Sequence, residues 1–353
     1  MTSRERMTLA LSHKEADRVP ILDGPWGTTV QRWKREGLPE DQSPASYFGY
    51  DRTVGIGGDT SFRLPGETLE QTEEYTITRN SNGVVHRNWK HATSTPELID
   101  FLIKDRKAWE EHKHRFIYDD TRVNFDNAVQ TFKNAREAGH FIQFGCALGY
   151  DFWQNVVGPE NLLPAMIEDP EWVKELYMAQ VELIINMASA LMAHGIEFDG
   201  ASFADDLGYR NGTFFSPKIY REQLFPAHKR LCDFLNEHGI FVILHSCGGV
   251  RALVPYFVEA GFACLNPLEV KSGMGVIELK REFGDKLTLM GGIDVRKMAA
   301  DDPAEIEEEI RTKISVAKVG GGYIYHSDHS VPDNVSFQQY KRVMELVREY
   351  GSY

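Results

Sequence analysis

A histidine and a cysteine two positions apart, His245-Ser-Cys247, form the sharpest chemical motif in the sequence. Imidazole nitrogen and thiolate sulfur are both good zinc ligands, and a catalytic zinc uses three protein ligands with one position left open. The later stretch His326-Ser-Asp-His329 offers a third ligand, and Glu269 offers another. The spacing leaves the choice among His326, His329 and Glu269 open. It also leaves open an inert pair, with His245 bound to a backbone carbonyl beside a buried cysteine.

Two adjacent carboxylates, Asp205 and Asp206, follow another apolar run. They are candidates for acid–base work or for anchoring a polar substrate, because paired carboxylates in a dry pocket push one pKa upward. The alternative for Asp206, and for Asp294 further along, is a helix N-cap. Aromatic residues flank the same loops and could either wall a substrate pocket or pack in the core: Trp26, Tyr150, Phe152, Trp153, Tyr209, Phe214 and Phe215. We predict that the substrate is bound by Trp26, Tyr150, Trp153, Tyr209 and Asp294.

The elements that must position these residues are short apolar runs separated by segments with helical periodicity. Strands that read as continuous apolar runs are buried on both faces, and their alternation with helices predicts a parallel sheet. In a (β/α)8 barrel the carboxyl ends of all strands meet on the face that carries the chemistry. We therefore predict one α/β domain over residues 1–353, a (β/α)8 TIM-type barrel, with an open doubly wound sheet as the alternative. The apolar runs are 141–146, 198–203, 240–244, 263–265, 287–290 and 322–325.

The first third of the chain carries a different pattern. Residues 74–90 alternate polar and apolar side chains around Asn82-Gly83, which predicts a hairpin with a type I′ turn. We expect this β-hairpin to be an excursion from the barrel over about residues 66–92. It would act either as a lid or as a cover of the barrel end.

Composition and charge narrow the classes of partner. The 353 residues include 39 Lys and Arg against 52 Asp and Glu, a net charge of −13, which argues against a nucleic-acid partner. No stretch of about 18 apolar residues predicts a membrane span, and the first twenty residues do not read as a signal peptide. Four cysteines without regular spacing indicate no disulfide framework, so we expect a cytoplasmic protein.

With these motifs in place, the sequence resembles the uroporphyrinogen decarboxylase superfamily. That resemblance implies a distorted (β/α)8 barrel, which agrees with the pattern of apolar runs. It also implies one of two chemistries: cofactor-free decarboxylation of uroporphyrinogen acetate side chains, or corrinoid-dependent methyl transfer, often with zinc. The segments that carry the resemblance are Ser3-Arg-Glu-Arg6, Asp17-Arg-Val-Pro20, residues 199–206 with Ser216-Pro217 and Phe225-Pro226, His245-Ser-Cys-Gly248, Met290-Gly-Gly-Ile-Asp294, and His329-Ser-Val-Pro332.

Departures from the family pattern favour the second chemistry. The decarboxylases carry an R-Q-A-G-R segment whose arginines meet substrate carboxylates, whereas the matching residues 23–29 contain no arginine. The zinc methyltransferases use H-x-C and a distant cysteine, and here we expect His329 to stand in place of that cysteine. A neutral imidazole in place of a thiolate leaves the zinc a stronger Lewis acid, which suits an ether or amine leaving group.

The leading hypothesis is a zinc-dependent, demethylase-type methyltransferase that passes a methyl group from a small donor, such as an O-methyl ether, to cobalt. Zinc would lie on His245, Cys247 and His329, while Asp205 or Asp206 orients the donor or supplies a proton. The chain contains no D-x-H-x-x-G segment, so the corrinoid (cobalamin) would be carried by a partner protein. The family also suggests a homodimer. The alternatives are a metal-free decarboxylase or lyase that uses His329 and the aspartates, and a barrel that only binds a ligand.

Overall fold

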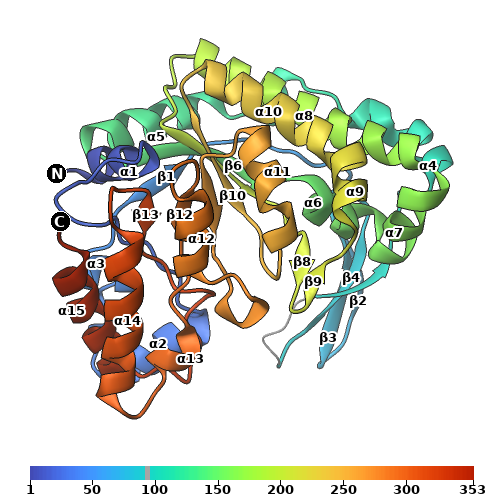
Figure 1. Ribbon diagram of the computed structural model, residues 1–353. Coiled ribbons are helices and arrows are strands. Elements are labelled where there is room, and N and C mark those ends of the chain that lie inside the picture. Colours follow the sequence, from blue (N-terminus) through green and yellow to red (C-terminus); the bar gives the residue numbers. More distant parts are fainter. Residues whose placement is uncertain (92–95) are drawn as a thin grey trace.

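The computed structural model describes residues 1–91 and 96–353, and its centre is a curled parallel sheet (Figure 1). The sheet has seven strands in the order β1-β6-β7-β10-β11-β12-β13. Because this order follows the chain without reversal, the doubly wound alternative, which requires a reversal of strand order, is wrong. The strands are β1 (Thr53–Gly55), β6 (Phe141–Ala147), β7 (Gly200–Ala204), β10 (Phe241–His245), β11 (Cys264–Asn266), β12 (Thr288–Met290) and β13 (Tyr323–Ile324).

Helices connect these strands and cover the outer face of the sheet (Figure 1). Their apolar faces and the outward-facing strand residues form the main core. Seven of the helices are α5 (Phe125–Glu137), α8 (Pro170–Ala193), α10 (Phe225–Glu237), α11 (Val254–Ala260), α12 (Val276–Phe283), α14 (Pro303–Ala317) and α15 (Phe337–Gly351). The remaining helices are α1 (Ser3–Leu11), α2 (Gly27–Glu36), α3 (Pro44–Tyr47), α4 (Arg106–His112), α6 (Gly149–Val157), α7 (Pro159–Glu168), α9 (Pro217–Ile219) and α13 (Val295–Met298).

Helix α8 is long and apolar enough, by length and composition, to cross a membrane. Its best window has a mean hydropathy of 1.4, and 56% of that window is buried inside the protein. A core helix that is buried on most of its surface has the same composition as a spanning one. Charged and polar residues interrupt its sequence, so the helix contains no unbroken apolar run of the length expected for a span.

The two edges of the parallel sheet are bridged by a short extended segment, residues 20–22, instead of an eighth strand. The N–H of Tyr325 donates to Pro20 O at 2.9 Å, and the N–H of Leu22 donates to Tyr325 O at 3.0 Å. On the other side the N–H of Asp51, just before β1, donates to Ile21 O at 2.8 Å. The predicted eight-stranded barrel is therefore only partly present, as a curled sheet of seven strands whose edges this segment links.

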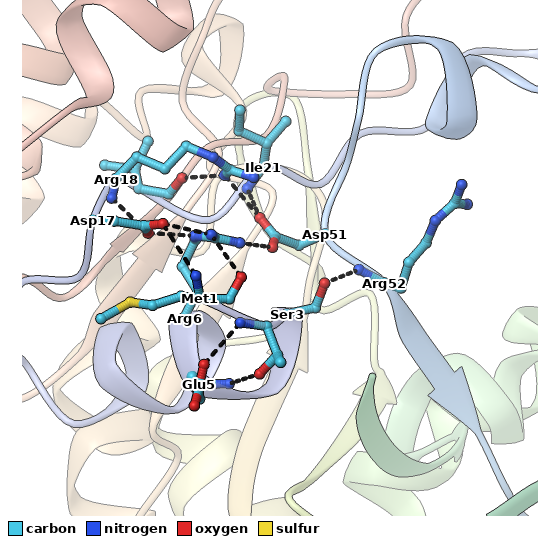
Figure 2. A network of polar contacts seen from close by, with 11 residues as sticks. Met1, Ser3, Glu5, Arg6, Asp17, Arg18, Ile21, Asp51 and Arg52 are labelled. Carbon is cyan, nitrogen blue, oxygen red and sulfur yellow. Dashed lines mark hydrogen bonds and ion pairs between the residues drawn. The ribbon is translucent and has the colours of Figure 1, made fainter. Parts of the chain in front are cut away.

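Helix α1 packs its apolar side chains against residues of the curled sheet and is held by an ionic network (Figure 2). The side chain of Asp51, 1% exposed, accepts hydrogen bonds from the guanidinium groups of Arg6 and Arg18 and from the N–H of Ile21. The Asp17 carboxylate holds the other side of Arg6 at 2.7 and 2.8 Å. The network therefore joins α1, the bridging segment and the start of β1.

A separate antiparallel sheet stands beside the parallel one, in the order β2 (Glu67–Gln71), β3 (Tyr75–Arg79), β4 (Val85–Trp89) and β5 (Glu97–Asp100). The predicted hairpin is present as β3 and β4, but the predicted type I′ turn is wrong. Arg79 pairs with Val85, which leaves a five-residue loop, and only Gly83 there has a positive φ, of 76°. The Asn80 side chain shapes this loop by accepting two backbone N–H groups. Residue 92, the end of the predicted excursion, lies outside the described residues.

Candidate metal centre and active site

The carboxyl ends of four strands of the parallel sheet bring potential metal ligands together. Asp206 follows β7, His245 ends β10 with Cys247 just after it, Glu269 follows β11, and His329 follows β13. Within the described residues the ligand atoms form two groups, Asp206–His245–Cys247 and Cys247–Glu269–His329, each with its atoms within 4.8 Å of one another. Cys247 belongs to both groups, so the predicted set His245, Cys247 and His329 spans the two.

The imidazole of His245 is oriented for coordination through Nε2. Its Nδ1 lies 2.7 Å from Asn266 Oδ1, on the neighbouring strand β11, and the Asn266 amide in turn donates to Met290 O at 3.2 Å. That second contact places the amide oxygen toward His245, so Nδ1 carries the proton and Nε2 presents its lone pair. Nε2 lies 3.4 Å from Cys247 Sγ. An outer hydrogen bond of this kind is the usual way in which a metal-binding histidine is held.

Carboxylates surround the thiol of Cys247. Asp206 Oδ1 accepts the backbone N–H of Cys247 at 2.8 Å and lies 3.7 Å from His245 Nε2. Burial raises the pKa of the Cys247 thiol, and the charges of Asp206 and Glu269 raise it further. A thiol among carboxylates stays protonated on its own, whereas a divalent cation offsets all these charges and favours the thiolate. The chemistry of this donor set therefore fits a zinc ion.

The stretch from His326 to His329 holds the second group in place. The buried carboxylate of Asp328 accepts the N–H of Val270 and the N–H of Val295, both at 3.0 Å, which ties the loop that carries Glu269 to the end of β13. Ser327 Oγ contacts His329 O at 2.6 Å. His326 instead turns back, with Nδ1 at 2.6 Å from Ser327 O, and joins neither ligand group. Of the three candidate third ligands, the structure brings Glu269 and His329 to Cys247.

Asp205 does not occupy the catalytic position that the sequence analysis assigned to it. It is fully buried, and its Oδ1 accepts the N–H of Asp151 at 2.8 Å. Its Oδ2 lies 3.0 Å from Nε2 of His228, which is carried by helix α10. Among the described residues, Asp205 therefore joins neither ligand group, whereas its neighbour Asp206 belongs to one of them.

Asp151, in the first turn of α6, is the acid that the sequence analysis missed. Burial raises the pKa of its carboxyl to about 6, the hydrogen bond from Gln154 lowers it, and the charges of Asp206 and Asp205 raise it again. A carboxyl group with such a pKa can exchange a proton near neutral pH. Its position directly after β6 was the available signal, because the other site residues also follow strands.

Two of the predicted substrate-binding aromatics are exposed. Trp26 is 44% exposed and stacks on His329, with ring centroids 6.3 Å apart and planes at 22°. Tyr209 is 48% exposed and packs on Phe214, with ring centroids 5.8 Å apart. Trp26 lies beyond the bridging segment, Tyr209 belongs to the short strand β8 (Gly208–Tyr209), and both side chains are exposed to solvent.

The other three residues predicted to bind substrate have different roles. Trp153 is fully buried and packs on Trp109 at 5.7 Å, so it belongs to the core. Tyr150 is also fully buried, beneath the aromatic side chains that follow β9 (Gly212–Thr213). Asp294 caps helix α13 by accepting the N–H of Arg296 and is paired with the same guanidinium. The core and N-cap alternatives therefore describe Trp153 and Asp294 correctly.

Comparisons with known proteins agree with this architecture. Residues 153–350, more than half of the chain, match the family model of uroporphyrinogen decarboxylase (URO-D). No curated protein sequence matches the chain. Among solved structures, a methyltransferase from Methanosarcina mazei superposes with a TM-score of 0.68 at 15% identity and covers 99% of each chain. A sugar phosphate isomerase/epimerase from Parabacteroides distasonis reaches a TM-score of 0.40 at 10% identity, over 95% of this chain and 96% of that one. By its sequence, the chain belongs to the uroporphyrinogen decarboxylase family.

Proposed function

We propose that this chain is a zinc-dependent methyltransferase that moves a methyl group from a small methylated donor, such as an O-methyl ether, to the cobalt of a separate corrinoid protein. The observation that carries the proposal is the group of nitrogen, sulfur and carboxylate donors around Cys247. Membership of the family and the fold shared with a methyltransferase support this reaction class.

The donor set indicates which residues would hold the metal. His245 and Cys247 are the central pair, and Asp206, Glu269 and His329 lie within reach to complete the site. Mixed nitrogen, sulfur and oxygen donors suit zinc better than magnesium or calcium, which prefer oxygen alone. When bound, the zinc would polarise the heteroatom of the methyl donor as a Lewis acid.

The other residues of the site would donate a proton, hold the Cys247 loop and contact the substrate. Loss of the methyl group leaves a negatively charged heteroatom on the donor, and the Asp151 carboxyl, whose pKa is raised by burial to about 6 and responds to the charges of Asp206 and His245, would supply the proton that this atom needs. Asp206 holds the Cys247 loop through the backbone N–H. Trp26 and Tyr209 would wall the donor, and their exposure fits a mouth that a large partner can approach.

The proposal is tested by methyl transfer to Co(I) cobalamin, followed by its absorbance, with a panel of O-methyl and N-methyl donors. We expect turnover with at least one donor in the wild-type protein and none in Cys247→Ala. Cys146→Ala is the matched control, because Cys146 lies in β6 and in neither ligand group. Equal turnover by Cys247→Ala and the wild type would contradict the proposal.

A metal-free decarboxylase or lyase is the second candidate, favoured by one observation. Asp151 is a carboxyl group that can hold a proton near neutral pH without any metal. Against it, the segment that carries arginines in the decarboxylases begins here with Asp23, whose carboxylate is occupied by the hydroxyl groups of Tyr340 and Ser327. Release of CO2 from carboxylated compounds by the metal-stripped protein would favour this candidate.

A further inference from the structure

A chain of three buried polar residues lies behind the site and has no part in the chemistry described so far. Tyr220 OH lies 3.0 Å from His228 Nδ1, and His228 Nε2 lies 3.0 Å from Asp205 Oδ2. All three side chains are at most 1% exposed. The 3.0 Å separation of Nε2 and Oδ2 is an ion-pair distance, and among the described residues neither atom has a partner that meets hydrogen-bond geometry. Such groups are costly to bury unless they satisfy one another.

The local backbone is arranged to make this contact. Residues Tyr220–Leu224 form a π-helical turn just before α10, which carries His228. Single π turns inside helices shift the side chains that follow and occur often at functional sites. Here the turn places the Tyr220 hydroxyl against the imidazole of His228. Phe262 packs edge-on against the same imidazole, with ring centroids 5.4 Å apart.

The polar atoms define which nitrogen of His228 carries the proton. Burial raises the pKa of Tyr220 well above its usual value, and the nearby charge of Asp205 raises it further, so the phenol stays protonated. No acceptor other than Nδ1 faces the Tyr220 hydroxyl within the described residues, so the hydroxyl donates to Nδ1. The imidazole proton then lies on Nε2, the nitrogen that is 3.0 Å from the carboxylate of Asp205.

Asp205 is linked to the site residues by backbone hydrogen bonds. Its Oδ1 accepts the N–H of Asp151, and its own N–H donates to His245 O, both at 2.8 Å. Successive side chains along an extended segment point to opposite sides. An Asp205 side chain that is held against His228 of α10 therefore leaves Asp206 on the opposite side, where it contacts Cys247. Gly149 leaves room for the carboxylate, because a Cβ there would lie 2.2 Å from Asp205 Oδ2.

We propose that His228 is a positioning residue that, held by Tyr220, fixes Asp205 and through it the two acids that face the site, Asp151 and Asp206. The role of these acids in methyl transfer rests on the proposed function above. The placement of the proton on His228 does not.

The tautomer of His228 can be measured independently of any activity. In metal-free protein labelled with 15N histidine, two-bond nitrogen–proton correlations distinguish Nε2–H from Nδ1–H, and the spectrum of His228→Gln assigns the signal. We expect the Nε2–H tautomer in the wild type and a loss of this preference in Tyr220→Phe. An Nδ1–H tautomer in the wild type would overturn the arrangement.

Two matched substitutions test the positioning role. The amide nitrogen of His228→Gln can take the place of Nε2 and still donate to Asp205, whereas His228→Asn keeps a polar atom only on the Tyr220 side. Loss of an outer-shell partner commonly costs about 10- to 100-fold in metal affinity or activity. We therefore expect His228→Asn to lose at least about 10-fold in zinc affinity and in methyl transfer, and His228→Gln to stay within about 3-fold of wild type.

The outcomes separate the two proposals. Thermal unfolding of both variants reports their folding, so an equal loss of stability with unequal zinc affinity points to positioning. Equal zinc affinity in His228→Asn, His228→Gln and wild type would overturn the inference. If the wild type binds no zinc and transfers no methyl group, the proposed function fails, and the tautomer measurement still decides whether Tyr220 and His228 hold Asp205.

Discussion

Asp51 offers the sharpest test of how the sheet edges are held together. The substitution Asp51→Asn keeps the shape of the side chain but removes the charge that two guanidinium groups share. Breaking a buried ion pair on one side costs about 3–5 kcal/mol, because the remaining charge is left in a poorly solvated place. Arg6 is only 8% exposed but keeps Asp17, and Arg18 is 22% exposed and partly solvated. The lower end, about 3 kcal/mol of unfolding free energy, is therefore expected.

The assay is equilibrium unfolding in urea, followed by circular dichroism, with Asp17→Asn as the matched control. Asp17 pairs with the same Arg6, but its side chain is 44% exposed, so this substitution should cost about 1 kcal/mol or less. The effect of Asp17→Asn should also shrink in high salt, whereas that of Asp51→Asn should not. If both variants lose the same stability, or if Asp51→Asn loses less than about 1 kcal/mol, the network does not hold the edges together in the way described.

Three further predictions follow from single contacts. Gly149→Ala should lose more than about 2 kcal/mol of unfolding free energy, because φ is +56° and its Cβ would collide with Asp205, whereas Gly195→Ala, with φ of +83° and open space, should lose about 1 kcal/mol. In metal-free protein, the raised pKa of Asp151 favours folding below the unfolded pKa near 3.8, and this contribution is lost as pH rises through about 6. Asp151→Asn should therefore flatten the urea midpoint against pH in that window, and an unchanged profile would contradict the assignment. Trp153→Ala should lower the unfolding free energy by about 3–5 kcal/mol while donor KM stays unchanged, and a raised KM in folded protein would return Trp153 to the substrate pocket.

Much of the candidate site was predictable because the carboxyl ends of parallel strands lie on the same side of a sheet. The apolar runs that precede Asp206, His245 and His329 marked three strands, and the chemistry of the next residues then indicated their meeting point. The family resemblance added the zinc hypothesis. Neither argument needed the positions of helices.

What sequence reasoning missed depends on contacts between distant parts of the chain. Asp205 and Asp206 are chemically identical neighbours in the sequence. Asp205 contacts His228 and the N–H of Asp151, whereas Asp206 accepts the N–H of Cys247, and none of these partners is adjacent in sequence. Trp153 follows a strand as a pocket residue would, but in the fold it packs against Trp109, which is distant in sequence.

The bridging segment was missed for a related reason. Residues 20–22 are too short a run to give a strand pattern in the sequence. Their extended backbone is held by hydrogen bonds to Asp51 and Tyr325. The hairpin loop shows the opposite case, because Asn82-Gly83 is a strong turn signal. There the side chain of Asn80 selected a longer loop.

The most direct test of the central claim is the zinc content of the purified protein, measured by inductively coupled plasma mass spectrometry after reconstitution. The site around Cys247 predicts about one zinc per chain in the wild type and in Cys146→Ala, and almost none in Cys247→Ala, which removes the ligand that both groups share. His245→Ala and His329→Ala, measured alongside, would show which group dominates. A wild-type protein without zinc, or a Cys247→Ala protein that keeps it, would contradict the account.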